Sequence, residues 1–137
     1  MAYMNQEHKA KLAPAIKSVL KKYGMKGSIG VSNHSTLVVN VKSGKLDVLQ
    51  NWFDDATKNG PLNMYGDVIQ KPTHIQVNEY WISEQYTGTV KDFLLELKEA
   101  MNVGNWDKSD IQTDYFNVGW YLSINIGKWD KPYQLEA

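Results

Sequence analysis

Histidine is the residue best suited to acid–base or metal chemistry here, and none of the three histidines has a partner at a ligand spacing. His8, His34 and His74 lack a histidine or carboxylate two to four residues further on, and the pattern H-E-x-x-H is absent. A small hydrolase-like site would need the fold to bring His34 or His74 to an acid such as Asp67 or Glu79. This arrangement stays an alternative hypothesis.

Motifs for other chemistries are also missing from the sequence. The chain contains no cysteine, which excludes disulfides, thiolate zinc sites and a cysteine nucleophile. No P-loop, G-x-G-x-x-G or G-x-S-x-G pattern occurs. We therefore predict no catalytic residue, metal or cofactor, and the sequence favours a binding protein over an enzyme.

The basic residues are distributed unevenly, although the net charge is zero. Residues 1–45 hold eight lysines and one acid, whereas residues 46–137 hold seven lysines and fourteen acids. Such asymmetry is found in proteins whose basic face meets an anionic partner, and equally in dipolar surfaces that bind nothing. There is no arginine, the residue whose planar fork reads guanine edges, so contact with a nucleic-acid backbone is favoured over base-specific reading of duplex DNA.

Candidate binding residues combine this basic segment with two ring side chains. Tyr121 lies on the polar side of an alternating strand, and His34 lies in a predicted turn. Aromatic side chains on an open sheet face stack nucleobases, although they more often fill cores and sheet edges. The predicted nucleic-acid-binding residues are Lys9, Lys17, Lys21, Lys22, Lys26, His34 and Tyr121.

The elements that must position these residues follow from the hydrophobic periodicity. Apolar residues at three- and four-residue steps predict helices over 5–23, 45–59 and 89–102. Period-two alternation predicts strands over 27–32, 36–42, 73–80 and 116–126, the first two forming an antiparallel hairpin. Residues 60–72 are the best candidate for a long loop, and loops of this length are often functional.

The order α-β-β-α-β-α-β predicts one α+β domain spanning 1–137, a two-layer sandwich with an approximately four-stranded sheet and three helices. Trp120, Leu122 and Ile124 are expected in the core, packed against the helices. The core is expected to include Ile16, Leu20, Phe53, Phe93, Leu94 and Leu97 on those helices. No apolar run is long enough for a transmembrane helix, and no secretory signal is seen, so we expect a cytoplasmic protein.

Both ends of the chain resemble a known group of proteins. The stretches AYMNQEHKAKLAPAIKSVLKKYGMKGSIGVSNHSTLVVNVKSG (2–44) and DYFNVGWYLSINIGKWDKPY (114–133) resemble a phage and mobile-element family of the large polyvalent protein-associated domain type. The resemblance covers about half of the chain and implies an origin on mobile DNA, in the host cytoplasm. The family has no established activity, so it assigns no catalytic residue.

The expected function is therefore that of an accessory binding protein. Its lysine-rich N-terminal face would engage an anionic partner, with single-stranded nucleic acid as the first candidate. The alternative is a protein-interaction module whose basic face meets an acidic host protein.

Overall fold

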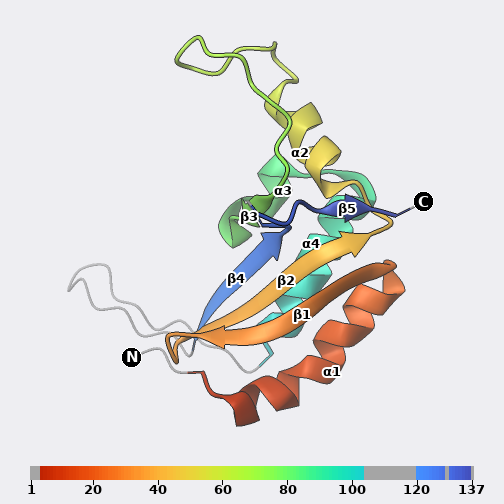
Figure 1. The fold of residues 1–137 in the computed structure, drawn as a ribbon, viewed down its shortest axis with the longest axis vertical. Helices are drawn as coiled ribbons and strands as arrows, with labels where there is room; N and C mark the ends of the chain where they lie inside the picture. The colour runs from red at the N-terminus through yellow and green to blue at the C-terminus, as the bar shows by residue number, and fades with distance from the viewer. Residues whose placement is uncertain (1–3, 104–119, 129, 137) are drawn as a thin grey trace, which may run out of the picture.

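The computed structural model describes residues 4–103, 120–128 and 130–136, and its strands form one mixed sheet (Figure 1). The strands are β1 (Met25–Ser32), β2 (Thr36–Gly44), β3 (Ile75–Val77), β4 (Tyr121–Ile126) and β5 (Gln134–Leu135). Their order is β1-β2-β4-β3, with β5 beside the end of β2. The pairs β1–β2 and β4–β3 are antiparallel, whereas β2 and β4 are parallel. Segments far apart in the sequence thus become the central strands.

The hairpin β1–β2 is antiparallel, as predicted, and its turn uses two left-handed residues. Asn33 has φ 53° and His34 has φ 54°. Positive φ at both central positions is the mark of a type I′ turn, whose twist matches that of the flanking strands. The turn therefore places two neighbouring residues other than glycine in the left-handed conformation.

Helices α1 (Gln6–Lys22) and α4 (Gly88–Met101) lie side by side on one face of the sheet (Figure 1). The Asn5 side chain caps α1 by accepting a hydrogen bond from the His8 backbone N–H at 2.7 Å, and the helix then continues through the exposed Pro14. The apolar stripes of both helices face the inward side of β2 and β4. The core they form includes Leu12, Ile16, Leu20, Leu37, Val39, Val41, Val90, Phe93, Leu94, Leu97, Ile124 and Ile126.

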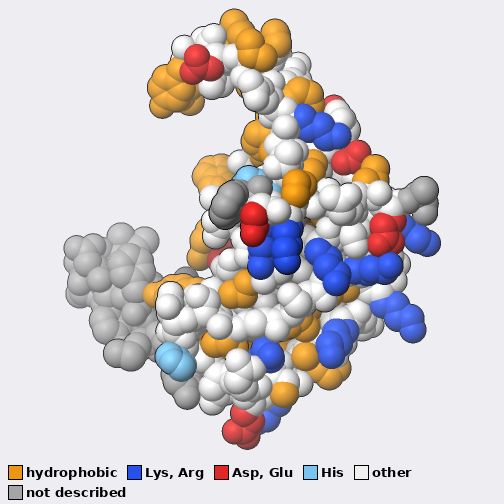
Figure 2. All heavy atoms as spheres, viewed as in Figure 1, with side chains coloured by type: hydrophobic (Ala, Val, Ile, Leu, Met, Phe, Trp, Pro, Cys, Tyr) orange, Lys and Arg blue, Asp and Glu red, His pale blue; other side chains and the backbone are white. Residues whose placement is uncertain are grey.

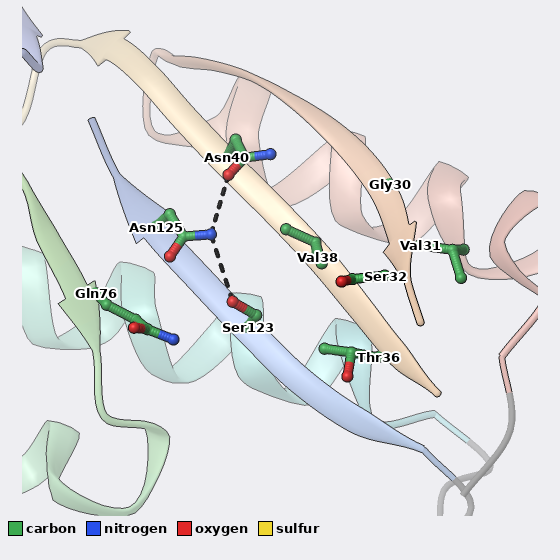
Figure 3. A pocket seen from close by; sticks show the side chains of 9 residues that line it. All are labelled: Gly30, Val31, Ser32, Thr36, Val38, Asn40, Gln76, Ser123 and Asn125. Carbon is green, nitrogen blue, oxygen red and sulfur yellow. Dashed lines mark hydrogen bonds between the residues drawn. The ribbon is translucent and has the colours of Figure 1, made fainter. Parts of the chain in front are cut away.

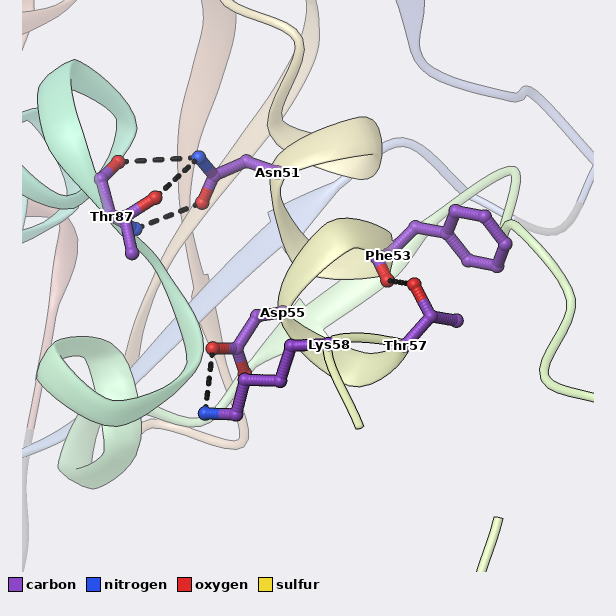
Figure 4. A network of polar contacts seen from close by, with 6 residues as sticks. All are labelled: Asn51, Phe53, Asp55, Thr57, Lys58 and Thr87. Carbon is purple, nitrogen blue, oxygen red and sulfur yellow. Dashed lines mark hydrogen bonds and ion pairs between the residues drawn. The ribbon is translucent and has the colours of Figure 1, made fainter. Parts of the chain in front are cut away.

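Helix α2 (Val48–Ala56) is fastened to the start of α4 by one amide side chain (Figure 4). Asn51 accepts a hydrogen bond from the backbone N–H of Thr87 at 3.0 Å and donates to the Thr87 carbonyl and hydroxyl, each at 3.2 Å. Within α2, the Thr57 hydroxyl donates to the Phe53 carbonyl, and Lys58 pairs with Asp55 at 3.2 Å. The Asn51 contacts hold α2 against the start of α4, and the other two stabilise the C-terminal turn of α2.

The mixed α and β composition is confirmed, but the element count is not the predicted one. The short helix α3 (Ile82–Gln85), the 3-10 helix η1 (Glu79–Trp81) and strand β5 were not predicted. The third strand covers only Ile75–Val77, because the Asn78 side chain accepts a hydrogen bond from Tyr80 N–H and turns the chain into η1. Of the predicted strand 116–126, residues 121–126 form β4, and 116–119 lie outside the described residues.

The predicted core is largely correct, with two exceptions. Trp120 and Ile124 are buried, whereas Leu122 and Phe53 are only half-buried.

No helix in the described part of the chain is long and apolar enough to cross a membrane.

The predicted loop 60–72 projects from the body of the molecule beyond α2 (Figure 1). A bridge between Leu62 and Val68 closes it, and the Asn63 side chain accepts hydrogen bonds from the backbone N–H groups of Tyr65 and Asp67. Met64 is 88% exposed and Tyr65 is 82% exposed. We call residues 60–72 the arm; its apolar side chains do not contribute to the core.

Candidate functional site

Five lysines from α1, β1, β2 and the residue after β2 line one groove. Lys17 and Lys21 come from α1, Lys26 from β1, Lys42 from β2, and Lys45 directly follows β2. The groove has a volume of about 710 Å³, and Glu136 supplies the carboxylate in its lining. Figure 2 shows lysine side chains gathered over the start of β1, the end of β2 and the C-terminal half of α1. We call these five lysines, with Glu136, the lysine groove.

A tight turn between α1 and β1 brings these lysines together. Gly24 follows the last residues of α1 with φ +68°, a left-handed conformation that glycine adopts without strain. The chain therefore reverses directly into β1, so that Lys21 and Lys26 lie at the same corner. The backbone N–H of Lys45 donates to the Gly24 carbonyl at 3.2 Å, which fixes the end of β2 against this turn.

Charge within the lysine groove is only partly neutralised. Lys26 pairs with Glu136 at 3.1 Å, and the Ser43 hydroxyl donates to the same carboxylate at 3.0 Å. The hydrogen bonds from Lys26 and Ser43 hold the pKa of the Glu136 carboxyl below its usual range. Lys17, Lys21 and Lys42 form no ion pair with any carboxylate among the described residues.

The basic surface continues past Lys42 to the turn that follows β4. Lys42, Lys128 and Lys131 line a second hollow together with Ser28 and Asn40. Two backbone hydrogen bonds between Lys128 and Lys131, at 2.8 and 3.1 Å, close this turn, and the exposed Asp130 lies within it. The cationic surface therefore reaches the face of the sheet that α1 and α4 leave uncovered.

That uncovered face is polar and shallowly hollowed (Figure 3). Its lining, which we call the polar face, is Gly30, Val31, Ser32, Thr36, Val38, Asn40, Gln76, Ser123 and Asn125. The pairing register places Ser28, Asn40, Asn125 and Gln76 in one row across four strands. The Asn125 side-chain amide donates to Asn40 Oδ1 at 3.0 Å and to Ser123 Oγ at 3.3 Å. The row is therefore an ordered set of hydrogen-bonding groups.

The five lysines predicted from the sequence do not share one surface. Lys17, Lys21 and Lys26 meet in the lysine groove. Lys9 instead lies against β1, with its Nζ 3.5 Å from the Ile29 carbonyl oxygen. Lys22 turns toward α4 and pairs with Glu96 at 2.7 Å. Lys9 and Lys22 therefore lie apart from the lysine groove, because their partners come from other elements.

The two predicted ring side chains lie at the opposite end of the sheet from the lysine groove. His34 is exposed in the hairpin turn, and Tyr121 pairs in register with Thr36 and is 49% exposed. Lys42 is six residues further along β2 than Thr36, a distance of about 20 Å along an extended strand. The polar face spans the gap between Tyr121 and the lysines.

The two histidines of the hydrolase hypothesis lie near opposite ends of the sheet. His34 lies beside Thr36 at the start of β2. His74 precedes Ile75, which is level with the far end of β2, and shares a hydrogen bond with Thr73. Asp67 is in the arm and Glu79 is in η1. Across the described residues, no group of three or more His, Asp or Glu side chains is placed to hold a metal ion.

Four lysines of the basic surface were missed at the sequence level: Lys42, Lys45, Lys128 and Lys131. Lys42 carried a signal, because alternation puts it on the polar side of its strand with Asn40. Lys128 and Lys131 had no such signal in the sequence, since their proximity to Lys42 depends on the parallel pairing of β2 with β4.

No protein-family model, curated protein or solved structure matched the chain.

Proposed function

We propose that this protein binds single-stranded nucleic acid without sequence specificity, with the phosphates held in the lysine groove. The observation that carries the proposal is the convergence of five lysines from α1, β1 and the end of β2 on one groove with one carboxylate. Lysines that neutralise phosphates release condensed counterions, and this release supplies most of the affinity of non-specific binding. The surrounding role, an accessory protein of phage or mobile-element origin, rests on the sequence resemblance.

The lysines suit contact with a backbone. An ammonium group on a flexible stem acts as a mobile point charge, whereas sequence reading commonly uses the rigid fork of arginine, which this chain lacks. Lys42 also joins the groove to the hollow that contains Asn40 of the polar face, and Tyr121 lies at the far end of that face. Unpaired bases can use such a surface, because their edges and faces are not occupied by a complementary strand. These two features favour a single strand over a duplex.

The proposal is tested by fluorescence anisotropy with labelled single- and double-stranded oligonucleotides over a range of salt concentrations. If four phosphates are neutralised, the log–log slope of the association constant against salt should be about −3 for a single strand. Replacing Lys17, Lys21 and Lys42 together by glutamine should weaken binding and make the slope shallower by about 2.

A matched control changes the same charge elsewhere. Lys11, Lys58 and Lys91, none of which lines the lysine groove, are replaced together by glutamine. This variant should bind almost as well as the wild type. Equal weakening by both triple variants would show that net charge alone attracts the oligonucleotide, and absence of binding at low salt would reject the function.

A second candidate function is the binding of another protein, and the arm is the observation that favours it. Leu62, Met64, Tyr65 and Val68 are all more than half exposed. Exposed apolar side chains grouped on one segment are typical of interaction sites. Changing Met64 and Tyr65 to serine should abolish capture of a specific partner, whereas the lysine-groove triple variant should retain it. The opposite pattern would assign protein binding to the basic surface.

A further inference from the structure

The polar face is an ordered hydrogen-bonding surface, and none of its described lining residues carries a charged side chain. Asn40 and Asn125 lie at its centre. The Asn125 amide nitrogen donates one hydrogen bond to Asn40 Oδ1 at 3.0 Å and another to Ser123 Oγ at 3.3 Å. These bonds leave the Asn125 carbonyl oxygen as an acceptor and the Asn40 amide nitrogen as a donor. Figure 3 shows both amides on the same face as Gln76.

We propose that the polar face binds the base edges of the single strand whose phosphates occupy the lysine groove. The inference rests on the proposed function and adds a second, neutral subsite to it. A nucleobase edge carries donors and acceptors side by side, which matches the alternating groups of Asn40, Asn125 and Gln76. A phosphate group offers acceptors only and would be poorly matched to the Asn125 carbonyl oxygen.

Continuity of the two surfaces supports this occupant. Asn40 lines both the polar face and the hollow formed by Lys42, Lys128 and Lys131. A strand held by those lysines therefore reaches the Asn40 side chain without crossing an apolar region. At the far end, Tyr121 offers an exposed ring on which a base can stack.

The geometry also limits how selective the subsite can be. The amides project from the middle of a shallow, open hollow and are not enclosed in a pocket that a single base would fill. Every base presents a donor or an acceptor to such a surface, so the contacts add affinity for bases without defining a sequence. This property is in accord with non-specific binding in the lysine groove.

The test compares two ligands that differ only in their bases: a short mixed-sequence oligonucleotide and an abasic oligonucleotide of equal length, both labelled and titrated at low salt. The wild type should bind the base-containing strand about tenfold tighter, a difference of one or two hydrogen bonds. Asn125→Ala should weaken binding of the base-containing strand about three- to tenfold and leave binding of the abasic strand unchanged.

Two further variants keep the test falsifiable. Gln76→Ala removes an exposed amide from the short strand β3 and should act in the same direction even if Asn125→Ala disturbs the sheet. Asn59→Ala makes the same type of change outside the polar face and should alter neither titration. Circular dichroism establishes that each variant is folded.

The outcomes separate the inference from the proposed function. Equal affinity for the two strands, with binding still dependent on Lys17, Lys21 and Lys42, would overturn the base subsite and leave the lysine groove in place. Absence of binding to both strands would reject the proposed function, and with it the subsite. If the wild type is a dimer that Gln76→Ala dissociates, the polar face is occupied by a second copy of the chain, and the proposal is overturned.

Discussion

Among the described residues, Glu136 supplies the one carboxylate that lines the groove of five lysines. Its side chain is held by Lys26 and Ser43, while its backbone N–H donates to the Gly44 carbonyl at 2.7 Å. The carboxyl is ionised at neutral pH, as glutamate ordinarily is, and the Lys26 and Ser43 hydrogen bonds lower its pKa further. An incoming phosphate must therefore compete with a negative charge for the ammonium group of Lys26.

Glu136→Gln should consequently strengthen oligonucleotide binding. The change removes a repulsive charge and frees Lys26, and we expect an affinity a few-fold higher at low salt, with the difference shrinking as salt screens it. Anisotropy titrations measure this directly. Glu99→Gln changes the same charge on an exposed position of α4 and serves as the control. Equal gains in both variants would attribute the effect to net charge.

Tyr86 shows a different residue-level feature, a buried hydroxyl that has no hydrogen-bond partner among the described residues. The side chain is 1% exposed, and burial raises the pKa of its hydroxyl. Leaving a polar group buried and unpaired costs free energy that an apolar replacement of the same shape does not. Tyr86→Phe should therefore raise the free energy of unfolding by about 1 kcal/mol in denaturant melts. A loss of stability would show that the hydroxyl is bonded in solution.

At the scale of elements, the β1–β2 hairpin depends on a turn with an unfavourable residue. His34 has φ 54°, a left-handed conformation that costs an ordinary side chain about 1 kcal/mol and costs glycine little. His34→Gly creates the Asn-Gly pair preferred in type I′ turns and should increase stability by about 0.5–1 kcal/mol. A thermal melt measures the change. Unchanged oligonucleotide binding by this variant would also exclude His34 from the binding residues.

The whole molecule is organised by the core between the sheet and the helices α1 and α4. Ile124 is 1% exposed at its centre, whereas Leu122 is only half-buried. Ile124→Ala should cost about 2–5 kcal/mol of unfolding free energy, because it removes buried methyl groups and leaves a cavity. Leu122→Ala should cost less in the same denaturant melts. The reverse order would place the wrong residue of β4 in the core.

The local pattern of the sequence predicted the longer helices and strands, but it missed the short elements and most contacts between elements. Alternation of Leu37, Val39 and Val41 identified β2 and its buried side, because burial on one face imposes period two. The end of β3 was missed because a single side chain, Asn78, redirects the chain. The candidate site was predicted only in part. The sequence grouped Lys22 with Lys17 and Lys21 because all three lie on one helix. Lys22 instead pairs with Glu96 of α4, a contact that local spacing does not reveal.

The parallel pairing of β2 with β4 joins residues 85 positions apart, and this separation has a consequence for biosynthesis. At about 5–20 residues per second, the ribosome needs roughly 4–17 s to deliver β4 after β2 has emerged. Helix α1 can cover the apolar side of the nascent hairpin during that interval, but the second edge of β2 has no partner. An unpaired strand edge is a template for association with other chains. We therefore expect the nascent hairpin to be prone to association with other chains until β4 pairs with β2.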